Sequence, residues 1–387
     1  MSEFMIVGAG IGGLTTAHAL LRQGHAVRVF EAASALREVG AGVVLGANAM
    51  QVLEQLGLGK AVREVGQPIK SIALLGRRGQ VLTAADTGAF AQRLGQDNLG
   101  IHRVALQRVL LAALPPGTVH LNRALTHFEA TLDSATAHFA DGTQASADAL
   151  VAADGLRSRV RLQLLPGSQP RYAGYTCWRA VVDGRSLRLP AGQSVEVWGG
   201  RAGRFGYVPL ADGQVYWFAC VNSSQANNPD YRAFAVADLR RQFAALPPPV
   251  AALLAITRDE QLLWNDILDI KPLPQFAFGR VLLTGDAAHA TTPNLGQGAG
   301  QAVEDALALA NCLQLHPDNL ASAFRAFDAR RRPRTTRIVE QSWLVGRLGQ
   351  LENTVLTSVR DAVMSRLPAW MNEKQMAFLY QGEGQRP

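Results

Sequence analysis

Residues 3–33 read EFMIVGAGIGGLTTAHALLRQGHAVRVFEAA. The apolar run 5–7 predicts a short buried strand, and residues 14–23 predict the helix that follows it. A second apolar run, 26–30, predicts another strand, which ends in Glu31. A strand, a glycine-rich turn, a helix and a strand in this order predict a βαβ unit of a parallel sheet.

The turn carries Gly8, Gly10 and Gly13 in the GxGxxG spacing. The first glycine permits a tight turn, the second lets backbone approach a pyrophosphate, and the third lets the helix pack closely on the strand. The start of the helix points free N–H groups at that phosphate. Glu31 is placed to accept a hydrogen bond from a ribose without a 2′-phosphate. These residues together predict a site for FAD or NAD.

A second informative stretch, residues 279–310, reads GRVLLTGDAAHATTPNLGQGAGQAVEDALALA. An apolar strand ends at Gly285-Asp286, and the turn 293–300, rich in Pro and Gly, opens directly into a helix-like segment. Its one histidine, His289, has no Ser or Cys nearby that would form a nucleophile with it. Taken singly, Asp286 could cap a helix and the glycines could form an ordinary turn.

Two further motifs, IHRVALQRVLLAAL (101–114) and ALVAADGLRSRVR (149–161), lie between these stretches. With all four motifs in this order, the sequence resembles the class A flavoprotein monooxygenases, the para-hydroxybenzoate hydroxylase family, over essentially its full length. The resemblance implies non-covalent FAD, with NADH or NADPH as a transient reductant. It also implies that a flavin C4a-hydroperoxide hydroxylates an electron-rich aromatic or N-heterocyclic small molecule.

The resemblance further implies which residues contact FAD. Asp286 would hold a ribityl hydroxyl, and the glycines of loop 293–300 would let backbone N–H groups reach the flavin pyrimidine carbonyl. The helix beginning near Gln301 would aim its positive end there and stabilise the anionic reduced flavin. The complete expected set is Gly8, Gly10, Gly13, Glu31, Ala32, Val44, Arg103, Gln107, Leu125, Asp154, Gly155, Asp286, Gly296, Gln297, Gly298 and Ala299. The loop 39–50 departs from the family at Gly46-Ala47, where Trp/Gly-Pro is common.

The fold class that follows is α/β with discontinuous domains. We expect a Rossmann-type FAD-binding domain from residues 1–72, 97–171 and 273–340. We expect a mostly antiparallel substrate-binding sheet from 73–96 and 172–272, because strand-like alternating runs with turn residues between them fill the longer segment. Residues 341–387 should be helical and pack against the FAD-binding domain rather than on a membrane.

The predicted substrate sheet contains no histidine, which disfavours a phenol activated by a sheet histidine. The segments YAGYTCWRA and RFGYVPLADGQVYWF look most like the urate hydroxylase branch, which implies catalytic roles for Arg204 and Tyr216. If these two residues lie on a hairpin turning at 209–214, they can share one face. The alternative is a surface arginine and a core tyrosine. We also expect Trp178, Arg179, Pro293 and Asn294 in the pocket, although that branch has Asp in place of Asn294.

Other function classes fit less of the chain. A tetracycline-inactivating or polyene-epoxidising monooxygenase would share the motifs, and a non-oxygenase NAD-binding protein would explain only the first fifty residues. The net charge is +7, but five arginines between 330 and 337 have near-helical spacing, which predicts a solvated helix face rather than nucleic-acid binding. Three scattered cysteines and the absence of a signal-like start favour the cytoplasm and no metal site. We expect a monomer or homodimer.

Overall fold

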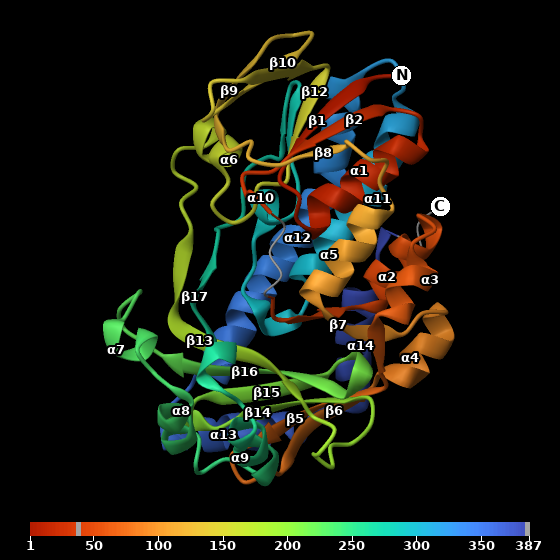
Figure 1. Ribbon diagram of the computed structural model, residues 1–387. Coiled ribbons are helices and arrows are strands. Elements are labelled where there is room, and N and C mark those ends of the chain that lie inside the picture. Colours follow the sequence, from red (N-terminus) through yellow and green to blue (C-terminus); the bar gives the residue numbers. More distant parts are fainter. Residues whose placement is uncertain (36–39, 384–387) are drawn as a thin grey trace.

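The computed structural model describes residues 1–35 and 40–383. Two halves, each built around a sheet, are bridged by long C-terminal helices (Figure 1). Val39, the first residue of the predicted flavin-facing loop, lies outside the described residues, as do the last four residues of the predicted helical segment.

A six-stranded sheet forms the centre of the first half. Its order is β18 (Ala277–Phe278), β19 (Val281–Leu283), β12 (Ala149–Ala152), β1 (Glu3–Val7), β2 (Ala26–Phe30) and β8 (Val119–His120). Every neighbouring pair is parallel except β18–β19. Strands from the two informative stretches thus flank β12. Ile6, Val151 and Leu282 are fully buried, as expected in a parallel sheet covered on both faces.

Helices and two smaller antiparallel sheets surround this centre. Helix α1 packs on α5 and α11, while the sheet β11-β10-β9 packs on β1 and β12. The sheet β3-β7-β4 lies next to α2 and α3. The bounds are α1 (Ile11–Arg22), α2 (Ala47–Gln55), α3 (Gly59–Glu64), α5 (Arg103–Ala112), α6 (Arg159–Leu164), α10 (Asp286–His289), α11 (Gly298–Leu315), β3 (Gly42–Leu45), β4 (Gly66–Ile69), β7 (Asn98–His102), β9 (Leu125–Ala130), β10 (Ala135–Phe139) and β11 (Gln144–Ala147).

A seven-stranded sheet forms the second half. Its order is β17 (Leu263–Asp269), β13 (Arg171–Asp183), β16 (Gln214–Asn222), β15 (Arg204–Pro209), β14 (Gln193–Trp198), β5 (Ser71–Gly76) and β6 (Val81–Asp86). Only β14 and β5 pair in parallel. The predicted fold class is therefore confirmed, while the predicted domain boundaries stay a prediction.

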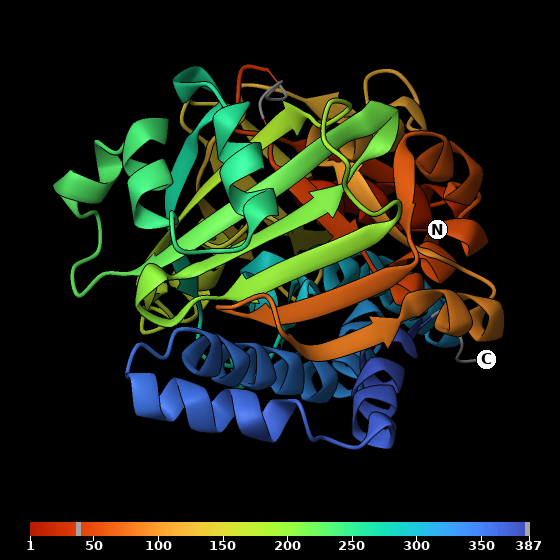
Figure 2. The same cartoon turned by 90° about the horizontal axis from the view of Figure 1, so that it is seen from below.

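Helices cover one face of this sheet and flank its edge. Figure 2 shows the green helices of residues 229–255 over the near face and the blue C-terminal helices beside the sheet. The helices of this half and of the C-terminal segment are α4 (Thr87–Leu94), α7 (Pro229–Arg232), α8 (Val236–Gln242), α9 (Pro248–Ala255), α12 (Leu320–Gly349), α13 (Thr354–Met364) and α14 (Ala369–Tyr380). Helix α13 contacts β6 and α14 contacts α2, so the C-terminal segment packs on both halves.

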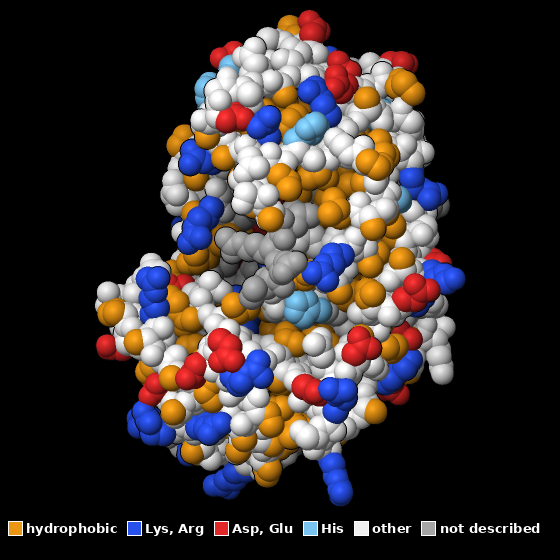
Figure 3. Space-filling model, viewed as in Figure 1, with side chains coloured by type: hydrophobic (Ala, Val, Ile, Leu, Met, Phe, Trp, Pro, Cys, Tyr) orange, Lys and Arg blue, Asp and Glu red, His pale blue; other side chains and the backbone are white. Residues whose placement is uncertain are grey.

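Two surface properties bear on possible partners. Among the described residues, no helix combines the length and the apolar character needed to cross a membrane. Basic and acidic side chains are interspersed over the face drawn in Figure 3, so the net charge of +7 does not gather there into one basic surface.

Candidate active site

The glycine-rich turn after β1 has a backbone that excludes larger residues at two positions. Gly8 has φ +103°, and a Cβ there would lie 2.4 Å from the carbonyl oxygen of Ala153. A Cβ at Gly13 would lie 1.9 Å from the carbonyl oxygen of Gly8, so α1 could not pack on the turn. The Cβ position of Gly10, by contrast, has no described atom within 4 Å. That open space, and the uncapped start of α1, suit an approaching phosphate.

Two side chains hold this turn in place. Glu31, directly after β2, accepts the backbone N–H of Ala9 at 2.8 Å and that of Ala33 at 2.9 Å. Gln107 of α5 donates its side-chain amide to the carbonyl oxygen of Ala9 at 2.8 Å. Arg103, at the start of α5, is exposed. The structure thus places Glu31 and Gln107 at the turn, while their contacts with FAD stay predictions.

The Asp154–Gly155 turn lies beside the glycine-rich turn, since the Asp154 Cα would be 3.1 Å from a Cβ at Gly8. One carboxylate oxygen of Asp154, Oδ2, accepts the N–H of Arg159 at 2.8 Å. The other, Oδ1, is buried and has no hydrogen-bond partner among the described atoms. Burial also raises the pKa of Asp154. Gly155 has φ +80° and open space at its Cβ position, so a polar ligand could approach both residues.

The Gly285–Asp286 turn is fixed from beneath by Asp305 of α11. Asp305 Oδ2 accepts the N–H of Gly285 at 2.8 Å and lies 2.7 Å from His289 Nε2. The carboxylate of Asp286 is exposed and makes no hydrogen bond to a described residue. It is therefore available to a hydroxyl of a ligand. His289 is buried against Asp305, which gives it a structural role.

The loop 293–300 leads into α11 through backbone with free space around it. Gly296 has φ +63° and no described atom within 4 Å of its Cβ position, and for Gly298 the nearest atom is 3.8 Å away. The side chain of Gln297 is buried and accepts a hydrogen bond from Asn48, so it is not available to a ligand. Helix α11 starts close to α1, because a Cβ at Gly12 would lie 3.1 Å from the Ala302 Cβ. The two loops therefore meet at adjacent helix starts.

A buried charge network lies behind the start of α11, and we call it the Arg331 network. The Arg331 side chain is 0% exposed, and its guanidinium is 2.7 Å from Asp305 Oδ1 and 2.7 Å from Glu304 Oε2. Arg334 also contacts Glu304, at 3.1 Å. The prediction that the arginines of 330–337 form a solvated face is wrong for these two, because buried carboxylates one helix away are their partners. The network comprises Asn48, Gln297, Gln301, Glu304, Asp305, Arg331, Arg334 and the buried Glu383, whose carboxylate lies 3.5 Å from Arg331.

Arg204 joins the seven-stranded sheet to the loop 293–300. Its Nη1 donates to Asn294 Oδ1 at 2.8 Å, and its Nε donates to Glu196 Oε1 at 2.7 Å. The hydroxyl of Tyr175 donates to the same Asn294 oxygen at 3.2 Å. Arg204 is 3% exposed, so the alternative of a surface arginine at a hairpin edge is excluded. Pro293, which begins the short 3₁₀ turn η4 (Pro293–Leu295), is exposed beside this contact.

Tyr216 lies on the same sheet face as Arg204. Arg204 pairs with Cys220, and Tyr216 is four residues before Cys220 on β16, so the two side chains share a face. Phe218, between them, pairs with Arg179, whose guanidinium hydrogen-bonds Tyr216. Burial raises the pKa of Tyr216 well above its usual range, so the phenol stays protonated and can donate a hydrogen bond.

Glycines on β3 and β7 let these two strands approach the seven-stranded sheet closely. A Cβ at Gly42 of β3 would lie 2.5 Å from the Tyr216 Cβ, so β3 packs directly on the tyrosine. Val44, two residues along β3, pairs with Gly100, and a Cβ at Gly100 would lie 2.3 Å from the Pro209 carbonyl oxygen. We call the face of the seven-stranded sheet that carries Arg204, Phe218 and Tyr216 the floor. It is bounded by β3 and β7 on one side and by loop 293–300 on the other.

The prediction that Trp178 belongs to this pocket is wrong. Trp178 pairs with Ala219, one residue before Cys220, and so points to the opposite face of the sheet. There it is fully buried and stacks on Phe234, with 5.3 Å between ring centroids. The alternation of side chains along β13 therefore places Arg179 on the pocket face and Trp178 in the core.

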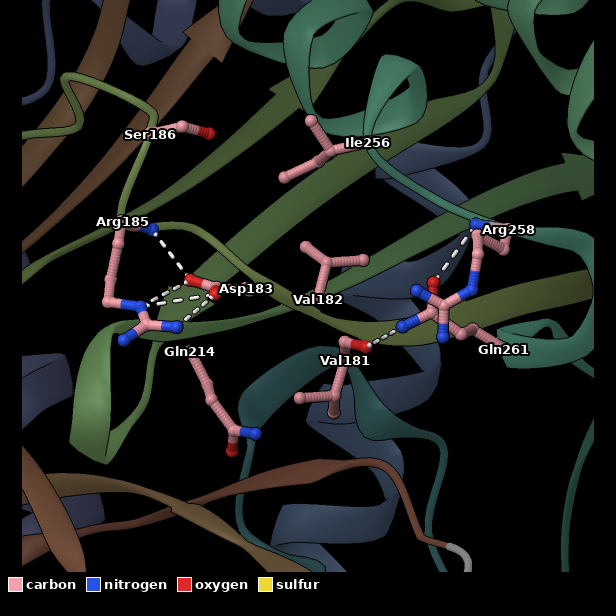
Figure 4. A pocket seen from close by; sticks show the side chains of 9 residues that line it. All are labelled: Val181, Val182, Asp183, Arg185, Ser186, Gln214, Ile256, Arg258 and Gln261. Atoms are coloured by element: carbon pink, nitrogen blue, oxygen red, sulfur yellow. Dashed lines mark hydrogen bonds and ion pairs between the residues drawn. The ribbon is translucent and has the colours of Figure 1, made fainter.

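A separate hollow of about 540 Å³ opens at the far end of the same sheet. Figure 4 shows Asp183 and Arg185 on one side of it and Arg258 and Gln261 on the other. The exposed carboxylate of Asp183 already pairs with Arg185 at 2.5 Å. Neither Arg204 nor Asn294 lines this hollow, so it is separate from the sheet face that carries Arg204.

Known proteins match the chain over nearly its whole length. Residues 1–342 match the FAD binding domain family. The chain is 39% identical over 362 residues to aurachin C monooxygenase/isomerase of Stigmatella aurantiaca, covering 93% of each protein. It is 34% identical over 337 residues to FAD-dependent urate hydroxylase of Klebsiella pneumoniae subsp. pneumoniae, covering 87% of each. The crystal structure of Klebsiella pneumoniae HpxO with FAD and uric acid is 29% identical, with a TM-score of 0.90 over 98% of this chain and 97% of that one.

The chain belongs to the class A flavin monooxygenases. The predicted family, FAD cofactor and reaction class are therefore confirmed. The residues fit the cofactor for two reasons. The Cβ positions of Gly10, Gly155 and Gly296 have free space around them, so a ligand can approach the backbone there. One Asp154 oxygen and the Asp286 carboxylate have no hydrogen-bond partner among the described residues, so they can bind polar groups of the cofactor. The individual FAD contacts stay predictions, including those of Ala32, which is exposed after β2, and Leu125, which is buried at the start of β9.

Sequence reasoning missed several residues that position this monooxygenase's site. Asp305 and Arg331 support the Gly285–Asp286 turn, and Glu196 and Tyr175 support Arg204 and Asn294. The only available signal was the pair of adjacent acids in the helix after loop 293–300. Their arginine partners come from a different helix, which no local pattern reveals.

We expect Asp286→Ala to weaken FAD binding about 10- to 100-fold, corresponding to roughly 1–3 kcal/mol for a lost acceptor in a partly desolvated site. The exposed carboxylate bonds no described residue, so its removal should leave the melting temperature of the apoprotein unchanged. Fluorescence titration of apoprotein with FAD measures the effect. The exposed Asp318, which follows the far end of α11, is a matched control, and equal affinities for the Asp286→Ala and Asp318→Ala variants would contradict the assignment.

Proposed function

We propose that this monooxygenase hydroxylates an electron-rich aromatic or N-heterocyclic ring lying on the floor of the seven-stranded sheet. The observation that carries the proposal is the bond from Arg204 Nη1 to Asn294 Oδ1. It joins the substrate sheet to loop 293–300, where the family places the flavin ring. A flat molecule between loop and sheet would therefore lie next to both.

The floor offers a donor pair and an apolar surface. Tyr216 and Arg179 can donate hydrogen bonds to a ring oxygen, and the Nε of Arg179 is buried without a partner among the described atoms. Phe218 lies between Arg204 and Tyr216, where an aromatic ring could stack on it. Buried apolar residues next to it, Tyr175, Cys177 and Cys220, would exclude water from the reaction.

The charge of Arg204 is compensated in this structure. Glu196 Oε1 lies 2.7 Å from Arg204 Nε and 2.6 Å from Nη2, and Asn294 occupies Nη1. A strongly anionic substrate would have to displace Glu196. We therefore propose a neutral or weakly acidic ring, such as a hydroxylated or oxo N-heterocycle, as the substrate class.

Bound FAD would carry two electrons from NADH or NADPH to O₂. One oxygen atom then enters the product and the other is released as water. The protein's own part is to orient the ring, to donate hydrogen bonds to the oxygen on which negative charge develops, and to keep water out. We further propose that it acts in the cytoplasm as a monomer or homodimer, with a small molecule rather than nucleic acid or a membrane as its partner.

Turnover under ¹⁸O₂ tests the proposal. Hydroxylated and oxo N-heterocycles are screened for stimulated NAD(P)H oxidation, and hits are analysed by product mass. We expect one labelled oxygen atom per product molecule, with faster NAD(P)H oxidation when substrate is present. The same reaction in H₂¹⁸O with unlabelled O₂ is the control. Label arriving from water, or activity only on strongly anionic rings, would contradict the proposal.

A further inference from the structure

Three metal-ligating side chains share one face of the small sheet β11-β10-β9. His127 and Glu129 are two residues apart on β9, so they point to the same side. His138 of β10 is the direct cross-strand partner of His127. The nitrogen and oxygen atoms that the three residues can offer lie within 4.8 Å of one another. Two histidines and a carboxylate thus converge on one small volume.

The two rings stack face to face, so at least one must rotate about its side-chain bonds before both can bind one ion, because a metal lies in the plane of each imidazole that binds it. The imidazoles of His127 and His138 are parallel, with 4.3 Å between centroids and 1° between planes. His138 Nε2 is 3.6 Å from Glu129 Oε1, and this nitrogen is buried without a hydrogen-bond partner among the described atoms. His127 Nδ1 lies 3.1 Å from the hydroxyl of Thr126, an outer contact that would leave Nε2 of the same ring for a metal.

We propose that His127, Glu129 and His138 form a binding site for a divalent transition metal such as Zn²⁺. Two imidazoles and one carboxylate are a donor set that zinc uses with a water in the fourth position. Tetrahedral zinc at about 2.1 Å from each ligand separates its donors by roughly 3.4 Å, close to the His138–Glu129 distance. Mg²⁺ and Ca²⁺ prefer oxygen donors and should bind poorly.

The alternative is a stacked histidine pair with a weak contact to Glu129. Such a pair accounts for the parallel rings, but it leaves the buried nitrogen of His138 without a partner. A metal satisfies that nitrogen and ties β9 to β10. No cysteine or histidine motif announces this site in the sequence, because its ligands come from two strands and meet only through the register His127–His138.

Calorimetric titration of the EDTA-treated, FAD-loaded enzyme with ZnCl₂ tests the proposal. We expect saturation at one Zn²⁺ per chain, and at least tenfold weaker binding of MgCl₂. His138→Ala and His127→Ala should each weaken Zn²⁺ binding tenfold or more, and Glu129→Gln should weaken it by less. His316→Ala, at the end of α11 and outside the cluster, should bind like the wild type.

A second measurement does not depend on calorimetry. Zn²⁺ should raise the melting temperature of the wild type and of His316→Ala, and should not raise that of His138→Ala. Because the three ligands lie on a solvent-facing strand pair, their replacement should leave the FAD content unchanged. Wild-type enzyme without saturable Zn²⁺ binding, or equal binding by His138→Ala, would overturn the proposal.

Discussion

Replacing Arg331 with alanine should lower the free energy of unfolding by about 3–5 kcal/mol, the range for removing one partner from a buried ion pair. The side chain is 0% exposed and contacts Glu304 and Asp305, which are themselves fully buried. The variant would leave both carboxylates with less compensating charge. Because Asp305 also holds the Gly285–Asp286 turn, FAD binding should weaken together with stability.

Urea unfolding of the apoprotein measures this effect. The variant and the wild type are compared with the same dependence of the unfolding free energy on urea concentration. Arg325→Ala is the control, because Arg325 lies on the same helix but is exposed. It should change the free energy of unfolding by no more than about 0.5 kcal/mol. A variant Arg331→Ala as stable as Arg325→Ala would show that the network contributes nothing.

The network should also respond to acid. Burial alone would raise the pKa of Asp305, but the charges of His289 and Arg331 outweigh it and lower this pKa to about 2. A carboxyl with a lowered folded-state pKa stabilises the protein above its unfolded value, near 3.9, and loses that contribution as the pH falls toward 2. The stability difference between wild type and Arg331→Ala should therefore shrink in that window.

Arg204→Gln should reduce kcat/KM by roughly ten- to a thousand-fold with the true substrate, the range for losing one charge-assisted contact in a closed site. The guanidinium connects Glu196 on β14 with Asn294 in loop 293–300. Without it, the loop loses its charged link to the sheet and keeps the hydrogen bond from Tyr175, while Glu196 loses its compensating charge. The FAD content should stay near wild type, because no predicted FAD contact bonds to Arg204.

Arg201→Gln is the matched control, since Arg201 is exposed on the neighbouring turn η1 (Gly200–Ala202). Steady-state kinetics, FAD absorbance and melting temperature are recorded for both variants. If Arg204→Gln turns over the substrate at near wild-type kcat/KM, Arg204 is not a site residue. If it loses FAD as well, Arg204 supports the fold rather than the substrate.

The parts of the site that are local in sequence were predictable. Gly8 and Gly13 are required by their own turn, and their spacing reveals it. Trp178 was misassigned because neighbouring residues on a strand differ only in which face they occupy. That choice is set by pairing with β16, more than thirty residues away, and not by the composition of the segment.

The buried arginines show a second limit of sequence reasoning. A row of arginines on a helix normally faces water, and nothing near Arg331 in the chain indicates otherwise. Its burial depends on acids of α11 that approach only when α12 packs on α11. Glu196 escaped notice for the same reason, since its role depends on the register Trp198–Arg204 between β14 and β15.

Helix α12 also contacts both halves of the molecule and sets the distance between the points of contact. Arg331, in the middle third of α12, pairs with Asp305 under the Gly285–Asp286 turn. The carbonyl oxygen of Ser342 accepts the Asn294 amide at 2.9 Å, and Gly349 at the end of the helix packs against Arg204. The eighteen residue-to-residue steps from Arg331 to Gly349 span about 27 Å at 1.5 Å per step. An α-helix scarcely stretches, so this flank of the pocket keeps a constant width. We therefore expect substrate to enter the pocket by movement of segments that do not pack on α12.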